Sequence, residues 1–312
     1  MRLVLPLVLA ALGCAACSDP EPTPVVETPT REITLPGGET LTIPERAVRI
    51  LPMSAAAVDY AIALVPRERI VAVPAAAVRY ACSLQRGEPW PEDRLVPEFS
   101  AEAMLAWDPD LVIAHVWQVP AEALEMVADS GVAVLRLDEV ESMQDVLDAV
   151  RVVASAVDEP RAGAQLVHDL EQRIAALRAG AAERSELRAI SYTNFGSGGW
   201  SAGSGTTAQI LIELTGMRNA GAEGGRAGHY ELDIERLLEL DPDLIVLSES
   251  TDEYSPTLTF LQNEPALASL RALERDWIVP LPAALFSTNS HHLVETAERL
   301  AAGVDALREQ PR

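Results

Sequence analysis

Two related stretches decide the fold of this sequence: SAEAMLAWDPDLVI at residues 100–113 and DIERLLELDPDLIV at residues 233–246. They align at a constant offset of 133 residues and share a capping residue, a glutamate two positions later, and the motif Asp-Pro-Asp-Leu. In each copy the capping residue predicts the start of a helix of about two turns. The proline then ends that helix, and the apolar run after it predicts a buried strand. One unit used twice predicts two lobes built on the same plan.

The segments around this repeat alternate between short apolar runs and helical patterns. Alternating residues at 32–35 and 40–43, on either side of Pro-Gly-Gly, predict a small hairpin. Further strands are predicted at 49–51, 70–73, 111–114, 132–135, 187–192, 244–247 and 277–281, and helices at 55–64, 101–107, 143–156, 160–182, 206–215, 234–240 and 292–307. This order predicts an α/β fold with parallel-rich sheets flanked by helices.

Length and composition agree with two folded lobes. The chain has 312 residues, of which 48% are hydrophobic and 23% charged, a balance typical of globular proteins. Its net charge is −23, and all 24 basic residues are Arg. Such a surface repels phosphate backbones and anionic lipid headgroups. We therefore expect no nucleic-acid partner, and contact with a membrane only through an anchor.

The first 31 residues have the pattern of an export and anchoring segment. Arg2 precedes an apolar run that ends at residue 13, which predicts a signal peptide over 1–13. Ala-Leu-Gly-Cys14 resembles a bacterial lipobox, which implies an exported protein lipidated on Cys14. Cys17 is the alternative lipidation site, and a plain secretory signal remains open. A Pro-rich tether is predicted over 14–31.

The sequence predicts no transmembrane helix and leaves the state of one cysteine open. No apolar run reaches the roughly 20 residues that a transmembrane helix needs. Cys82 is the only cysteine beyond the predicted tether. A buried, inert thiol and a pairing with Cys17 both remain open at this point.

Several segments together resemble a known family, the helical-backbone periplasmic binding proteins of ABC importers for ferric siderophores, haem and cobalamin. The resemblance is carried by IPERAVRI at 43–50, AEAMLAWDPDLV at 101–112, LTGMRNA at 214–220, NEPAL with LRAL at 263–273, and the closing helix from residue 292. It implies lobes over 32–157 and 184–312 joined by a long linking helix over 158–183. It also implies a monomer that captures a metal chelate or corrinoid in the cleft and delivers it to a permease with its ATPase.

The resemblance further implies a docking residue in each lobe. Members of this family place a glutamate on the outer face of each lobe to pair with permease arginines, and the matching positions here are Glu102 and Glu235. Two such pairs would fix the docking orientation. The alternative is an ordinary first-turn glutamate that stabilises the helix dipole.

Candidate ligand-binding residues follow the predicted strands, because parallel α/β lobes bind ligands beyond the carboxyl ends of their strands. Aromatic and Arg side chains there suit a large flat or apolar ligand with carboxylate or catecholate groups. The candidates are Arg79, Tyr80, His115, Trp117, Trp200, Arg226, Tyr230, Tyr254 and Phe286. Trp107 and Trp277 are predicted in the core. The His spacing matches no local metal motif, so we expect no resident metal or cofactor, with axial ligation of a haem ligand by His115 or Tyr80 as a minor option.

An enzyme is the competing hypothesis. Gly199-Trp-Ser201-Ala-Gly satisfies Gly-x-Ser-x-Gly, and Asp252 and His291 follow in the chain order of an α/β-hydrolase, which would make the protein an exported esterase. That motif requires a strand directly before the serine and a helix directly after it. Residues 193–198 and 203–205 intervene here, so the sequence favours a binding protein over an enzyme.

Overall fold

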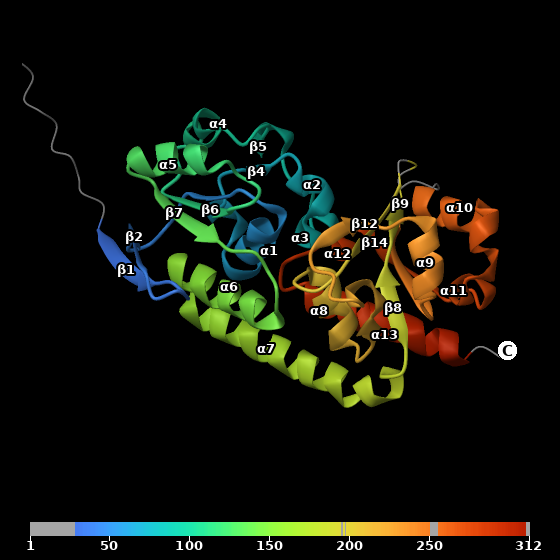
Figure 1. The fold of residues 1–312 in the computed structure, drawn as a ribbon. Helices are drawn as coiled ribbons and strands as arrows, with labels where there is room; N and C mark the ends of the chain where they lie inside the picture. Colours follow the sequence, from blue (N-terminus) through green and yellow to red (C-terminus); the bar gives the residue numbers. More distant parts are fainter. Residues whose placement is uncertain (1–28, 195, 197, 250–254, 310–312) are drawn as a thin grey trace, which may run out of the picture.

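Two larger parallel sheets form the framework of the molecule, shown in Figure 1. The structure is a computed structural model that describes residues 29–194, 196, 198–249 and 255–309. The first sheet has the strand order β3-β6-β7, and the second has the order β11-β8-β13-β14, with all pairs parallel. The predicted α/β class and the parallel-rich sheets are therefore confirmed.

The N-terminal lobe contains the first sheet, the hairpin β1–β2 and the short parallel pair β4–β5. Its helices α4 and α5 lie on one side of the sheet, and α1 and α6 lie on the other (Figure 1). The elements are β1 (Thr30–Thr34), β2 (Thr40–Pro44), β3 (Ile50–Pro52), α1 (Ala55–Leu64), η1 (Arg67–Arg69), β4 (Val73–Pro74), α2 (Ala77–Tyr80), α3 (Cys82–Arg86), η2 (Glu92–Arg94), β5 (Leu95–Val96), α4 (Ala101–Leu105), β6 (Leu111–His115), α5 (Ala121–Asp129), β7 (Ala133–Leu137) and α6 (Met143–Ala156).

The C-terminal lobe follows the 20-residue helix α7 (Pro160–Ala179), which runs along the base of both lobes in Figure 1. Beside its parallel sheet lies a small antiparallel sheet of order β12-β10-β9. The elements are η3 (Ala181–Arg184), β8 (Arg188–Ser191), β9 (Thr193–Asn194), β10 (Gly199–Ala202), α8 (Thr207–Leu214), β11 (Arg218–Asn219), η4 (Ala220–Ala222), β12 (His229–Glu231), α9 (Ile234–Leu240), β13 (Leu244–Glu249), α10 (Pro256–Asn263), η5 (Pro265–Ser269), α11 (Arg271–Glu274), β14 (Ile278–Pro282), α12 (Ala283–Phe286) and α13 (Leu293–Glu309).

The long helix is anchored at its start by a close approach to α6. Gly163 faces Ala154 of α6, and a Cβ atom at residue 163 would lie 2.2 Å from the Ala154 Cβ. Glycine therefore permits the two helices to touch. Further along α7, Leu170 and Ile174 pack into one apolar core with residues of both parallel sheets. This shared core joins the lobes.

The repeat forms the same capped helix and turn before an inner strand of each parallel sheet. Ser100 and Asp233 cap their helices as predicted, and Asp108 and Asp241 both adopt left-handed φ angles, of 47° and 38°. The second aspartate of each motif then ties in the neighbouring strand. Asp110 accepts hydrogen bonds from the backbone N–H groups of Val48 and Arg49, at 2.8 and 3.1 Å.

In the C-terminal lobe the second aspartate of the motif makes the same kind of hydrogen bond. Asp243 accepts from the backbone N–H of Arg188 at 3.0 Å. An arginine thus precedes or begins the neighbouring strand in both lobes, and each donates to a carbonyl of the Asp-Pro turn: Arg49 to Asp108 at 2.6 Å and Arg188 to Asp241 at 3.2 Å.

The structure differs from the predicted elements in several places, of which three concern the strands. β1 begins at Thr30, two residues before the predicted start of the lobe at 32. The strand predicted at 70–73 is reduced to an isolated bridge between Ile70 and Ile50 and to β4, where Pro74 removes a backbone donor. The antiparallel sheet containing β10 was not predicted, because its strands are only two to four residues long.

Candidate ligand-binding site and the contact between the lobes

His115 is the most strongly defined candidate in the N-terminal lobe. It ends β6, is 1% exposed, and its Nδ1 lies 2.8 Å from the Ser54 hydroxyl, which also caps α1 by accepting from the Ala57 N–H. The other ring nitrogen, Nε2, has no hydrogen-bond partner among the described residues. Burial lowers the pKa of His115 to about 4, so the ring is neutral at pH 7. When Nδ1 donates to Ser54, Nε2 carries a free lone pair, which is buried with the rest of the ring.

Two exposed aromatic side chains lie in the same lobe. Trp117 is 55% exposed, and its ring centroid lies 6.1 Å from that of His115. Tyr80, at the end of α2, is 41% exposed, and the guanidinium of Arg79 lies 5.7 Å from its ring. The structure therefore brings His115 and Trp117 together, and Arg79 and Tyr80 together.

In the C-terminal lobe the predicted aromatic residues do not share one surface. Trp200 pairs with Glu231 and Ser201 pairs with Tyr230 across β10 and β12. Because successive residues of a strand face opposite sides, Trp200 and Tyr230 lie on opposite faces of this ribbon. Trp200 is exposed, whereas the Tyr230 hydroxyl donates to the Gly221 carbonyl at 2.6 Å.

The remaining predicted ligand residues fall into three situations. The guanidinium of Arg226 lies 4.8 Å from the Tyr230 ring, on an exposed turn. Phe286 is half-buried and packs against the main core, although its helix α12 contacts α2, which carries Tyr80. Tyr254 lies outside the described residues.

A buried polar cluster joins the lobes beside these residues. Asp59 of α1 is 1% exposed and accepts hydrogen bonds from the Ser83 N–H at 2.8 Å and from the Ser290 hydroxyl of the C-terminal lobe at 2.9 Å. The Ser83 hydroxyl lies 3.2 Å from Nε2 of His292. Burial raises the pKa of Asp59, partly offset by the nearby His292.

Tilted aromatic rings and an ion pair extend this contact. His291 lies 5.7 Å from the Tyr60 ring and 4.2 Å from the His292 ring, and burial lowers its pKa to about 3. Arg86 of α3 donates to both carboxylate oxygens of Glu295 in α13, at 2.5 and 2.6 Å.

Cys82 lies within this contact as a buried thiol with no disulfide partner among the described residues. Burial raises its pKa to about 12, which disfavours the reactive thiolate. Its proposed partner Cys17 lies outside the described residues, as do Cys14 and the predicted signal peptide.

The serine of the competing hydrolase motif does not form a nucleophile elbow. Ser201 lies inside the antiparallel strand β10, and its hydroxyl donates to the Ser191 carbonyl at 2.8 Å. The helix α8 begins only at Thr207. His291 belongs to the contact between the lobes, and Asp252 lies outside the described residues. The strand–serine–helix arrangement that the motif requires is therefore not present at Ser201.

The predicted docking residues occupy equivalent positions. Glu102 and Glu235 are both exposed in the first turns of α4 and α9, one in each lobe.

Across the described ranges of the chain, no group of three or more metal-ligating side chains gathers, and no helix combines the length and apolarity that crossing a bilayer requires.

Comparison with known proteins decides the family. The sequence profile described as "Periplasmic binding protein" matches residues 58–285, which include strands of both larger sheets. The chain belongs to this family. Its match to a cobalamin-binding protein of Halobacterium salinarum is 24% identical over 202 residues, 64% of this chain and 53% of that protein. The chain thus spans about half the length of that relative. A vitamin B12-binding protein of Pectobacterium carotovorum is 24% identical over 66% of this chain and 71% of its own length.

Solved structures of binding proteins share the fold. A periplasmic haem-binding protein in complex with two haems superposes with a TM-score of 0.71 at 27% identity, covering 83% of this chain and 98% of that one. The periplasmic vitamin B12-binding protein of Vibrio cholerae gives a TM-score of 0.66 at 20% identity, covering 85% of this chain and 99% of that one.

Sequence reasoning missed Ser54 and Asp59 of this binding protein. Asp59 carried a usable signal, since a lone carboxylate inside the apolar helix 55–64 requires buried hydrogen-bond donors. Ser54 carried none, because its capping role does not reveal that it contacts a histidine 61 residues away.

Proposed function

We propose that this chain is the substrate-binding component of an ABC importer, and that as a monomer it captures a ferric siderophore, cobalamin or haem in the cleft between its lobes. The observation that carries the proposal is the family match over residues 58–285. Two relatives with cobalamin or vitamin B12 in their names, and a haem-bound protein of the same fold, support this class of ligand.

The aromatic, Arg and His side chains predicted to bind ligand support a metal chelate or corrinoid. Trp117, Tyr80 and Trp200 each expose an aromatic face, which can stack on a macrocycle or a catecholate. Arg79 and Arg226 offer guanidinium groups to ligand carboxylates. His115 adds a neutral imidazole whose Nε2 is unpaired among the described residues. The metal would arrive as part of the ligand.

The decisive experiment is a titration of the purified chain with haemin, cobalamin and a ferric hydroxamate siderophore, following Trp fluorescence. Saturable quenching by one class, reduced in Trp117→Phe but unchanged in Trp277→Phe, is the expected result. Trp277 serves as a matched control because it is half-buried against the C-terminal core. The absence of quenching with all three ligands would contradict the proposal.

Export and anchoring complete the proposal. The signal peptide over 1–13 would direct export and be removed, and the tether over 14–31 would hold the lobes at the outer face of a membrane through lipid on Cys14. Replacing Cys14 with Ala is expected to release the protein from membranes during fractionation, whereas Cys17→Ala leaves it bound. The reverse outcome would move the anchor to Cys17.

Delivery to the permease would use the repeated glutamates. Glu102 and Glu235 are exposed on equivalent helices, so a double charge reversal with Arg is expected to abolish uptake while ligand affinity stays unchanged. A matched control reverses Glu122 and Glu274, which are also exposed, one in each lobe. Normal uptake by the Glu102→Arg/Glu235→Arg variant would remove both residues from docking.

A further inference from the structure

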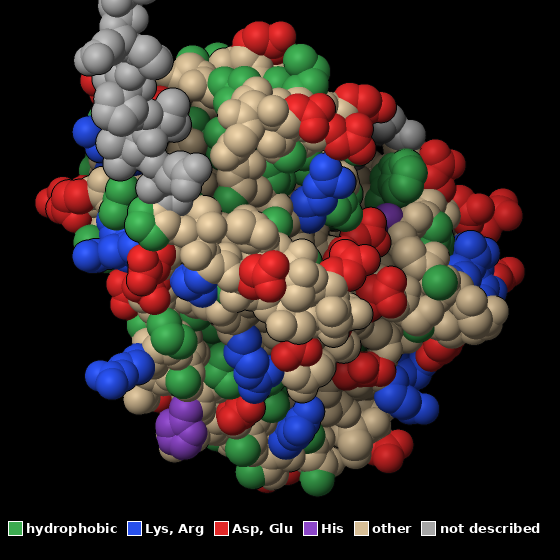
Figure 2. Space-filling model, turned by 90° about the vertical axis from the view of Figure 1, so that its left-hand side faces the viewer, with side chains coloured by type: hydrophobic (Ala, Val, Ile, Leu, Met, Phe, Trp, Pro, Cys, Tyr) green, Lys and Arg blue, Asp and Glu red, His purple; other side chains and the backbone are tan. Residues whose placement is uncertain are grey.

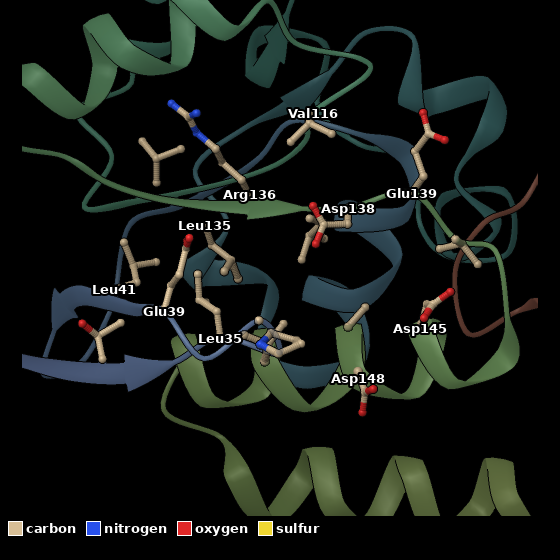
Figure 3. Close-up of a pocket in the computed structure, with 18 residues that line it drawn as sticks. Leu35, Glu39, Leu41, Val116, Leu135, Arg136, Asp138, Glu139, Asp145 and Asp148 are labelled. Atoms are coloured by element: carbon tan, nitrogen blue, oxygen red, sulfur yellow. The ribbon is translucent and has the colours of Figure 1, made fainter.

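A cavity lies outside the contact between the lobes, on the hairpin side of the N-terminal lobe. It has a volume of about 660 Å³, within the range typical of small-molecule sites. The turn of the hairpin β1–β2, the open edge of β7 and the exposed side of α6 form its walls (Figure 3). None of the residues predicted to bind the transported ligand lines it.

Part of the wall of this cavity is apolar and incompletely covered. Leu35 and Leu41 from the hairpin and Ala149 from α6 are only partly buried, and Val116 is 44% exposed. Figure 3 shows Leu35 and Leu41 on the same side of β7 as α6. A ligand with an apolar body would remove this surface from water, which is favourable in proportion to the area buried.

One wall supplies unpaired backbone groups. Among the described strands, β7 is hydrogen-bonded only to β6. The Leu137 carbonyl accepts from the Val116 N–H on the β6 side, so the backbone groups of Val134 and Arg136 are directed to the open edge. The hairpin strand β2 contacts β7 without pairing with it, which leaves no room for a continuous additional strand. The cavity therefore suits a compact ligand better than an extended peptide.

The rim of the cavity is acidic. Its lining includes five carboxylates, from Glu39, Asp138, Glu139, Asp145 and Asp148, and one guanidinium, from Arg136. Asp145 accepts from the Ser142 N–H and Asp148 pairs with Arg151, whereas Glu39, Asp138 and Glu139 are exposed. Arg136 points away from the hairpin and from α6 in Figure 3. Figure 2 shows this side of the molecule, where acidic side chains gather beside exposed hydrophobic atoms.

Two occupants from the chain itself do not complement this charge. Residues 14–29 contain Asp19, Glu21 and Glu27 but no basic residue, so the tether would be repelled. A second copy would bring the same acidic rim and a net charge of −23. We propose that the cavity binds a small organic cation with an apolar body, whose ammonium group lies at the acidic rim beside Asp138 and whose apolar part contacts Leu35, Leu41 and Ala149.

The test uses a matched pair of probes on the full chain. 4-Phenylbutylamine carries the proposed cation, and 4-phenylbutyrate carries the same apolar body with the opposite charge. We expect the amine to bind saturably, with Kd on the order of 1 mM for so small a probe, and to shift the amide NMR signals of Val134, Arg136 and Ala149. The carboxylate is expected to leave them unchanged. Equal binding of both probes, or no saturable binding of the amine, would overturn the proposal.

Variants then locate the site. Asp138→Asn/Glu139→Gln is expected to weaken amine binding about fivefold, because two exposed carboxylates each contribute modestly. Ala149→Trp fills the cavity and is expected to abolish binding. Glu122→Gln/Glu125→Gln, on exposed positions of α5 outside the cavity, is the control and leaves binding unchanged. Unaltered amine binding in both cavity variants contradicts the site.

Discussion

At the scale of single residues, Asp59 is the side chain on which the contact between the lobes most depends. It is buried in α1, yet it accepts hydrogen bonds from α3 and from Ser290 of the other lobe. Buried carboxylates persist only where such donors surround them. Its neighbour Tyr60, whose hydroxyl donates to the Asn289 carbonyl at 3.3 Å, adds a second link across the same boundary.

Replacement of Asp59 with Ala is expected to lower the free energy of unfolding by about 3 kcal/mol. The reason is that the Ser83 N–H would remain without an acceptor, and the buried Ser290 hydroxyl would keep only the Thr288 hydroxyl as a partner. Urea unfolding measures the change. Asp169→Ala, on an exposed position of α7, is the matched control and should alter stability by less than about 0.5 kcal/mol. A loss at Asp59 no larger than the control would show that water replaces the missing acceptor.

The buried His115 makes stability depend on pH. Its pKa falls from 6.5 in the unfolded chain to about 4 in the folded protein. The unfolded state therefore binds the proton more readily between these values, and the contribution is complete above pH 6.5 and lost as the pH falls toward 4. The loss reaches roughly 3 kcal/mol near pH 4.

Comparison of the parent with His115→Gln isolates this effect, because the raised pKa of Asp59, which acts in the opposite direction, is present in both. The variant is expected to show a flatter dependence of unfolding free energy on pH between 6.5 and 4.5. His168→Gln, at an exposed position of α7, is the control and should follow the parent. Identical slopes for parent and His115→Gln would mean that the ring is hydrated in the folded protein.

At the scale of secondary-structure elements, the Asp-Pro-Asp turn acts as a connector between two strands. Its first aspartate adopts a left-handed conformation after the helix, and its second accepts backbone N–H groups at or just before the start of the adjacent strand. The Asp110 N–H also donates to the Arg49 carbonyl at 3.0 Å, as the Asp243 N–H does to Arg188 at 2.8 Å. The repeat therefore sets which strands become neighbours in each lobe.

The two copies of the Asp-Pro-Asp turn are expected to contribute different amounts to the free energy of unfolding. Asp110→Ala should lower the unfolding free energy by about 1 kcal/mol, because its partners lie at the exposed end of β3. Asp243→Ala should cost about 2 kcal/mol, since Asp243 is 8% exposed and also pairs with Arg271 at 2.8 Å. Urea unfolding with Asp129→Ala as an exposed control checks both values. A larger loss at Asp110 than at Asp243 would reverse this ranking.

At the scale of the whole molecule, one apolar core crosses the boundary between the lobes. Ile113 of the first sheet and Val246 of the second belong to the same buried cluster, together with Ile174 of α7 and Leu300 of α13. The opposite face of each sheet has its own smaller cluster. The lobes are thus two by topology but share their largest core.

We therefore expect the lobes to unfold in a single transition. Single-Trp variants that keep either Trp107 or Trp277 should report coincident urea midpoints, because each probe lies in a different lobe. Ile174→Ala should lower the unfolding free energy by about 3 kcal/mol. Both urea midpoints should therefore fall together. Arg178→Ala, at an exposed site on α7, serves as the control. Two separated transitions in the parent would show that α7 joins the lobes without coupling them.

Local sequence decided the elements and much of their order. The repeat, the caps at Ser100 and Asp233 and the apolar runs after each proline identified the α/β class, because these signals depend only on neighbouring residues. The same signals placed His115 and Trp117 together, since they follow one strand.

Only the tertiary structure decided which side chains share a surface. Trp200 and Tyr230 are close along the ribbon but face opposite sides, because strand register, which local sequence does not specify, fixes the face of every residue. Asp59 meets Ser290 across 231 residues of chain, and the cavity at β7 exists because a hairpin from the start of the lobe packs beside a later strand and helix. These contacts arise from packing between distant elements, whereas the helices and strands themselves are encoded by the periodicity of their own residues.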